Sequence, residues 1–423
     1  MGNVQLAVQF FFQIAVILVA CRFVGFLAGK IGQPQVVAEM IAGVLLGPSF
    51  FGVFWPELQL SVFPWDRTQE FRDTQSYLFP ASQLGLSLYM FIVGMEFRIE
   101  VVGEQLKCSL AVSAAGMIAP FILGAGLGWV FFNYTDLFPI QTSLLDASIF
   151  LGASMCITAF PMLARIIHLK GLAGTPMGTV AIGAAAIDDA TAWCLLAVVM
   201  SSFEGNISSA LNAVSGGIAF AVTMMLVVRP LMKHSQKRFQ TPDGTLSDLG
   251  TAIALISMAL GAWFTDLIGL HAVFGAFVAG TAMPRAVTRE LIGRIEPLTI
   301  ALLLPLFFTY SGLNTRIQLL NSWFLWAMCG LVLATAVTGK FGACWLAARA
   351  SGMPNREALG VGSLMNARGL MELIIINIGL QRGIISEHLF ALLVIMAILT
   401  TLFASPLFAR LTRPSSERSR HIS

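Results

Sequence analysis

Long apolar stretches, separated by short gaps that hold charged residues, glycine and proline, make up nearly the whole chain. Division at those gaps gives thirteen segments, and most of them are long enough to cross a bilayer as a helix, for which roughly 20 residues suffice. The predicted spans are residues 4–29, 34–54, 79–97, 106–132, 145–168, 174–202, 208–234, 247–267, 270–287, 296–314, 321–349, 355–381 and 386–412. The pattern therefore predicts an all-α polytopic membrane protein.

The overall composition agrees with this prediction. Of the 423 residues, 57% are hydrophobic and 11% are charged, and the mean hydropathy is +0.81, which excludes the soluble class. A net charge of +3 is too small to indicate a nucleic-acid partner. The six cysteines lie in apolar spans without metal-ligand spacing, and the five histidines have no such spacing either, so we expect no cofactor and no structural metal site.

Basic residues are distributed unequally between the two sides of the predicted spans. Counted over alternate loops, 19 of the 25 Lys and Arg residues fall on one side and four on the other. Because positive charge marks the cytoplasmic face, the N-terminus is predicted outside and the C-terminus in the cytoplasm. The two remaining basic residues, Lys340 and Arg368, lie inside spans and need partners there.

Two adjacent acids, Asp188 and Asp189, lie in the apolar run from Met177 to Met200. A charge in mid-membrane costs at least ~2.5 to 3.5 kcal/mol, so each acid must face a cavity, find a partner or bind a proton. Neighbours on a helix point about 100° apart, and we therefore expect different roles for the two. A carboxyl group removed from water can exchange a proton for a cation, whereas polar contacts between helices would not require two adjacent acids.

Three further charged residues lie within predicted spans and must also be compensated there. Lys340 lies near the middle of span 321–349, and either Asp188 or Asp189 could be its partner; the alternative is that its side chain reaches the membrane surface. Arg368 and Glu372 are four residues apart, so they can form an ion pair on one helix face, which would steady the helix structurally.

Two spans are interrupted by residues that break a helix. Thr158-Ala-Phe-Pro161 interrupts one, and Asn366-Ala-Arg-Gly369 interrupts the other. Such breaks occur at membrane depth only beside a cavity, and an odd number of spans suits inverted repeats, in which residues 145–202 and 321–381 would correspond. We expect the transport site between the breaks, lined by Thr158 and Asn366.

Several of these motifs occur together in a recognisable order. The chain, from about residue 5 to 410, resembles the cation/proton antiporter-2 family of sodium or potassium/proton exchangers. The resemblance rests on residues 33–48, 157–161, 186–193, 305–308 with 311–312, and 366–372. It implies an antiporter, not an enzyme, in which Asp189 binds Na⁺ or K⁺ in exchange for protons and Asp188 pairs with Lys340.

The resemblance also implies an architecture. It is a homodimer of thirteen-helix subunits with two crossed discontinuous helices, in which a core domain moves like an elevator against a scaffold. On that pattern the scaffold and dimerisation domain is 1–100 and 246–318, and the core ion-transport domain is 101–204 and 319–413. A linker helix and cytoplasmic loop would occupy 205–245, and a cytoplasmic tail 414–423. The expected location is a bacterial plasma membrane, with a role in pH homeostasis.

Other classes fit the sequence less well. A cation channel or potassium efflux pathway without proton coupling would need no paired titratable groups. An intramembrane aspartyl protease needs its two acids on separate helices, but here they are adjacent. A symporter of organic anions would bring its substrate against two carboxylates. The choice between Na⁺ and K⁺ stays open at this point.

Overall fold

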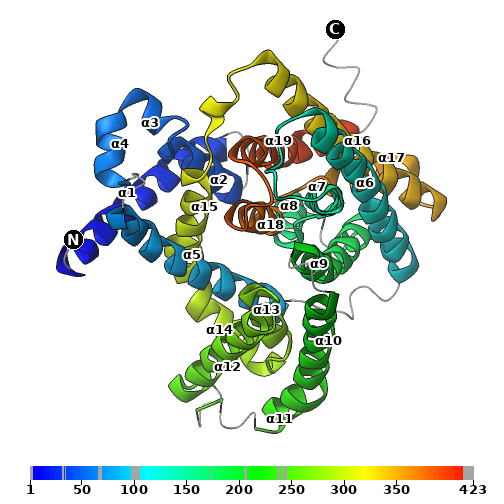
Figure 1. Ribbon diagram of the computed structural model, residues 1–423. Coiled ribbons are helices and arrows are strands. Elements are labelled where there is room, and N and C mark those ends of the chain that lie inside the picture. The colour runs from blue at the N-terminus through cyan, green and yellow to red at the C-terminus, as the bar shows by residue number, and fades with distance from the viewer. Residues whose placement is uncertain are drawn as a thin grey trace. The chain divides into compact units, whose positions relative to one another are not determined.

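The computed structural model (Figure 1) describes residues 3–30, 33, 35–64, 69–96, 105–172, 174–203, 207–235, 239–241 and 245–412. Nearly all of these residues are helical, and within the described ranges the β contacts amount to one isolated bridge between Gln240 and Leu246. Nine helical stretches in this part of the chain are long and apolar enough to cross a membrane, judged by length and composition. The predicted all-α fold class is confirmed. The predicted tail, 414–423, lies outside the described residues.

The chain divides into two compact units. The first comprises residues 1–24, 39–97 and 200–314, and the second comprises 25–38, 98–199 and 315–423. The predicted scaffold, core and linker ranges and the roles assigned to them stay predictions; residues 25–38 of the predicted scaffold fall in the second unit, and the predicted linker 205–245 falls in the first.

In the first unit, the described residues form eleven α-helices in whole or in large part, several of them short. They are α1 (Asn3–Lys30), α2 (Gln35–Leu46), α3 (Phe51–Phe54), α4 (Pro56–Val62), α5 (Gln69–Glu96), α10 (Ile207–Thr223), α11 (Arg229–His234), α12 (Asp248–Leu267), α13 (Ala272–Thr281), α14 (Arg285–Leu298) and α15 (Leu304–Leu313). Two glycines let helices approach closely: a Cβ on Gly43 of α2 would meet the backbone of Phe308, and one on Gly94 of α5 would meet that of Phe277. Close backbone contact of this kind is typical of helices packed in membranes.

The second unit contains the six predicted spans that carry the candidate site. Its helices are α6 (Leu106–Tyr134), α7 (Leu144–Cys156), α8 (Phe160–Leu169), α9 (Pro176–Phe203), α16 (Trp323–Ala350), α17 (Asn355–Leu364), α18 (Leu370–Gln381) and α19 (Glu387–Thr412). Helix α6 packs against α7 and α16, and α16 also contacts α17 and α19. In this unit α7 and α17 stop inside predicted spans, 145–168 and 355–381.

Both predicted interruptions are present as breaks between helices. Helix α7 ends at Cys156 and α8 begins at Phe160, which places Pro161 in the first turn of α8, where a missing N–H costs no helical hydrogen bond. Helix α17 ends at Leu364 and α18 begins at Leu370. The inverted-repeat relation between the two halves stays a prediction.

Two segments expected as loops contain helices. Helix α14 fills the charged gap between spans 270–287 and 296–314, where Glu290 and Arg294 form an i,i+4 ion pair with a 3.0 Å contact. A division based on hydropathy assigns such a polar helix to a loop. The gap between predicted spans 34–54 and 79–97, which the predicted orientation places outside, likewise contains α4 and the start of α5.

Candidate ion-binding site at two broken helices

The two helix breaks of the second unit contact each other directly. The backbone N–H of Ala159 donates to the carbonyl of Ala367 over 3.1 Å, and Thr158 Oγ1 lies 3.2 Å from the carbonyl oxygen of Met365. Unwound backbone at membrane depth needs such partners because lipid provides none. The two breaks therefore form one structural element. Thr158 lies in the first break and Asn366 in the second.

Asp188 of α9 is fully buried and accepts hydrogen bonds from three side chains. Ser113 Oγ lies 2.6 Å from its Oδ1, while Thr158 Oγ1 and Lys340 Nζ lie 2.8 Å and 2.9 Å from its Oδ2. Thr158 has a single hydroxyl proton, so it can donate either to Asp188 or to the backbone at any one time. The negative charge of Asp188 is thus compensated by an ammonium group and up to two hydroxyls.

Lys340 of α16 is also fully buried, so its side chain does not reach the membrane surface. Besides Asp188, it donates to the carbonyl oxygen of Cys156 over 2.5 Å. Cys156 is the last residue of α7, and a cation at a helix C-terminus is favoured by the helix dipole. Of the two partners that the sequence left open for Lys340, the structure places Asp188 at the ammonium group.

Asp189 lies in a different environment, although it is the next residue along α9. It is 2% exposed, and neither carboxylate oxygen has a hydrogen-bond partner among the described residues. The backbone of Phe160, at the start of α8, lies near this carboxylate, and the N-terminus of a helix favours negative charge. A buried carboxylate with so little compensation is costly unless it binds a proton or a cation.

Asn366 supplies an oxygen of the kind that hard cations prefer. Its side chain is 2% exposed, and Nδ2 donates to the carbonyl of Gly362 over 3.1 Å. Its Oδ1 has no hydrogen-bond partner among the described residues. Among all the residues that the structure describes, no group of three or more His, Cys, Asp or Glu side chains could hold a metal ion.

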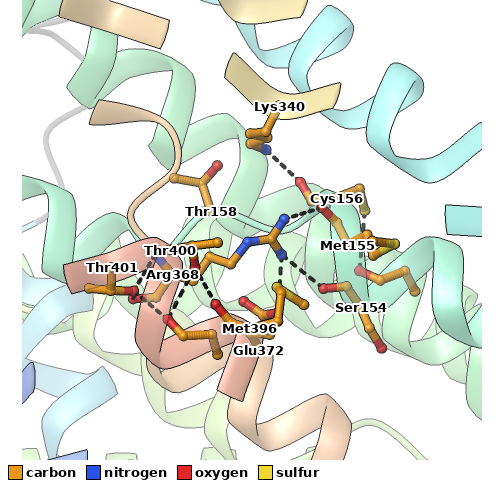
Figure 2. A network of polar contacts seen from close by, with 12 residues as sticks. Ser154, Met155, Cys156, Thr158, Lys340, Arg368, Glu372, Met396, Thr400 and Thr401 are labelled. Atoms are coloured by element: carbon orange, nitrogen blue, oxygen red, sulfur yellow. Dashed lines mark hydrogen bonds and ion pairs between the residues drawn. The ribbon is translucent and has the colours of Figure 1, made fainter. Parts of the chain in front are cut away.

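Arg368 belongs to the second break, and its side chain reaches the end of α7 (Figure 2). Its guanidinium donates to the carbonyl oxygens of Ser154 and Met155 over 3.0 Å and 2.7 Å, and to Glu372 Oε1 over 3.1 Å. The predicted Arg368–Glu372 pair is therefore present, and both residues are 1% exposed. Together with Lys340, Arg368 supplies cationic donors to three consecutive carbonyls at the end of α7.

Two hydroxyl residues of this site were not predicted from the sequence. Ser113 of α6 donates to Asp188, and Thr401 of α19 accepts from the backbone N–H of Arg368 over 3.0 Å and donates to its carbonyl over 2.8 Å. Neither residue titrates or breaks a helix, so a search for charges and breaks passes over both. The only signal in the sequence is a hydroxyl in the middle of an apolar span.

The sequence profile of the family described as "Sodium/hydrogen exchanger, transmembrane" matches residues 14–413. The chain belongs to this family. Its members are transporters. The family assignment agrees with the resemblance noted from the motifs.

Individual relatives of this exchanger cover nearly its whole length. The chain is 39% identical over 401 residues to "Na(+)/H(+) antiporter NhaS4" of Synechocystis sp., covering 94% of this chain and 96% of that one. It is 28% identical to "Na(+)/H(+)-K(+) antiporter GerN" of Bacillus cereus, covering 94% and 95%. It is 34% identical to "Cation/H(+) antiporter 20" of Arabidopsis thaliana and spans 49% of that protein's length.

Solved structures support the fold of this exchanger. The chain superimposes on the sodium proton antiporter MjNhaP1 from Methanocaldococcus jannaschii with TM-scores of 0.62 and 0.66 in two structures. Sequence identities are 13% and 14%, and the alignments cover at least 94% of each chain. At this identity the likeness shows a common fold.

Proposed function

We propose that this chain is a secondary antiporter that exchanges a monovalent cation, Na⁺ or K⁺, for protons, with Asp189 as the carboxylate that both ligands share. The observation that carries the proposal is the contrast between two adjacent buried acids. Asp188 is compensated by three donors, whereas neither oxygen of Asp189 has a hydrogen-bond partner among the described residues. A buried acid of the second kind is stable with a proton or with a cation, but not with neither.

Competition for one carboxylate is sufficient for exchange. When Asp189 holds a proton it cannot hold a cation, so the two ligands cross the membrane in opposite directions. Asn366 Oδ1 offers a neutral oxygen for the cation, and the N-terminus of α8 stabilises the carboxylate during the change of ligand. Lys340 keeps Asp188 paired, so the competition is confined to Asp189.

The transported cation is proposed as Na⁺ or K⁺ on the names of relatives. NhaS4 is named a Na⁺/H⁺ antiporter, GerN a Na⁺/H⁺-K⁺ antiporter, and a yeast relative that is 31% identical a K⁺/H⁺ antiporter. No relative named here is a channel, so the alternative of an uncoupled pathway gains no support. Both ions remain in the proposal.

Alternating access is proposed to follow the elevator mechanism of a homodimer in a bacterial plasma membrane. All the site residues, Ser113, Thr158, Asp188, Asp189, Lys340, Asn366, Arg368 and Glu372, belong to the second unit. A site contained in one compact unit can move with that unit as a body, which supports this mechanism. The N-terminus is proposed outside and the C-terminus in the cytoplasm, on the distribution of basic residues.

Proteoliposomes with an enclosed pH dye test the proposed function. Addition of Na⁺ or K⁺ outside should change the internal pH of wild-type vesicles. The change should persist when the membrane potential is held at zero and no protonophore is present. Asp189→Asn should abolish the signal, and Asp189→Glu, which keeps the carboxyl group, should retain part of it. Cation flux without any pH change would contradict the antiporter and favour a channel.

A further inference from the structure

Helices α3 and α4 form a short hairpin around Trp55, in the segment between α2 and α5 (Figure 1). The sequence led us to expect an external loop over residues 55–78. The hairpin instead folds back along α1, within the first unit. Val62 and Phe63, at its end, are buried in a hydrophobic cluster together with Ile17 of α1.

Two glutamines of α1 hold the end of the hairpin. Gln9 Nε2 lies 2.8 Å from the carbonyl oxygens of both Ser61 and Val62, and Gln13 Nε2 lies 3.0 Å from that of Val62. Gln9 and Gln13 are four residues apart, on one face of the helix. Gln13 is 3% exposed, so its polar side chain is covered by the hairpin that it binds.

These contacts define how deep the hairpin lies. From Asn3 to Cys21, α1 carries no charged residue. These 19 residues extend about 28 Å along the helix, close to the ~30 Å thickness of a hydrocarbon core. Gln9 and Gln13 lie about 9 Å and 15 Å from the Asn3 end of that stretch, at 1.5 Å per residue. The carbonyl groups that they bind are therefore well below the membrane surface.

The hairpin's own backbone is paired as such a depth requires. Trp55 N–H donates to Phe51 O and Gln59 N–H to Trp55 O, both over 2.9 Å, and Phe63 N–H donates to Gln59 O over 2.7 Å. Ser61 Oγ donates a hydrogen bond to the carbonyl oxygen of Leu58 over 2.8 Å. With the glutamines, these bonds satisfy much of the short hairpin's polar backbone, which lipid could not do.

The outward side chains of the hairpin are mostly apolar. Six of them are 44% to 60% exposed, namely Phe50, Val53, Phe54, Trp55, Leu58 and Leu60. Glu57, in the first turn of α4, is the one charged residue between positions 50 and 64. An aromatic surface with a single charge suits the boundary between acyl chains and headgroups, where Trp is enriched.

We propose that the α3–α4 hairpin is a lipid-immersed element, which contacts acyl chains and headgroups of the leaflet around the N-terminal half of α1 through Phe54 and Trp55. In the proposed orientation this is the outer leaflet. Gln9 and Gln13 anchor the hairpin at that depth. The inference does not depend on the transported ion or on the antiport mechanism.

Depth-dependent fluorescence quenching tests this inference. Trp55→Cys would be labelled with bimane in the full-length protein, in phosphatidylcholine nanodiscs that carry nitroxides at the headgroup, at acyl carbon 5 or at acyl carbon 12. We expect strong quenching by the carbon-5 nitroxide and little by aqueous iodide. Asp136→Cys, at an exposed position between α6 and α7, should show the reverse. Unmutated protein treated with bimane provides the blank.

A second variant tests the anchor. Gln13→Leu, combined with labelled Trp55→Cys, should raise quenching by iodide several-fold, because the hairpin loses a bond that holds it in the membrane. If residue 55 were quenched by iodide as strongly as residue 136, the hairpin would be aqueous and the inference wrong. Protection from both quenchers, together with cross-linking between copies at residue 55, would also overturn it, because a second copy would then cover this surface.

Discussion

At the scale of single residues, the site separates two neighbouring acids by their partners. The Asp188–Lys340 pair is buried, and removal of one member of such a pair typically costs ~3 to 5 kcal/mol because the other charge is left uncompensated. Lys340→Ala should therefore lower the melting temperature strongly. The loss of stability should lie toward the lower end of this range, since Ser113 and Thr158 continue to donate to Asp188.

A double-mutant cycle shows whether the two residues are coupled. Asp188→Asn removes the charge that Lys340→Ala strands, so the double mutant should recover stability, with a coupling energy on the order of 0.5 to 3 kcal/mol. Asp189→Asn combined with Lys340→Ala should recover less. Thermal melts of purified protein in detergent measure all of these variants, and additive effects of Lys340 and Asp188 would refute the pairing.

Ser113 can be tested against a serine on the same helix. Its hydroxyl donates to a carboxylate over 2.6 Å, and a hydrogen bond to a charged group contributes about 1.5 to 3 kcal/mol. Ser113→Ala should lose stability in that range. Ser109→Ala is the matched control, because Ser109 Oγ has only a 3.4 Å contact with the carbonyl of Val180. Equal melting temperatures for the two variants would show that the contact to Asp188 contributes nothing.

At the scale of elements, the end of α7 and the second break are held together by Arg368 and α19. Thr401 binds both the N–H and the carbonyl of Arg368, so it fixes the backbone from which the guanidinium reaches α7. Thr401→Val keeps the shape but loses both bonds, together with the 2.8 Å contact of the hydroxyl with Ala397 O in its own helix. The backbone N–H of Arg368 would be left buried without its partner, so we expect the free energy of unfolding to fall by about 1 to 3 kcal/mol. We also expect slower exchange in proteoliposomes.

Thr400→Val is the control for that experiment. Thr400 is the preceding residue of α19 and is equally buried. Its hydroxyl donates within its own helix, to the carbonyl of Met396 or of Ala397, and the bond to Ala397 is one that Thr401 can also make. The change should therefore leave exchange near the wild-type rate. If Thr400→Val slowed exchange as much as Thr401→Val, the effect would come from the helix in general and not from the bond to Arg368.

The sequence predicted those parts of the fold and site that produce a strong local signal. Apolar length gave the spans, the charges inside spans gave Asp188, Asp189, Lys340, Arg368 and Glu372, and proline or polar interruptions gave both breaks. Ser113 and Thr401 give no such signal, because their roles arise only when α6 and α19 pack against the site. The hairpin at α3–α4 was missed for the same reason, since its depth depends on contacts with α1.

At the scale of the whole molecule, the distribution of basic residues predicts the topology. A reporter fused after residue 423 should read cytoplasmic, and one inserted near Asp136 should read external. The excess of Lys and Arg in alternate loops is the physical basis. Accessibility in intact cells to an impermeant thiol reagent provides a second readout. An external C-terminus would reverse the proposed orientation and show that a span was miscounted.

The central claim is that a single carboxylate, Asp189, binds both ligands of the exchange. The most direct test compares wild type and Asp189→Asn in the proteoliposome assay, after both proteins have been shown to fold by thermal melting. The replacement keeps the size of the side chain and removes its titratable charge. We predict that Asp189→Asn melts at or above the wild-type temperature and shows no cation-dependent pH change. Exchange at the wild-type rate by the well-folded variant would contradict the account.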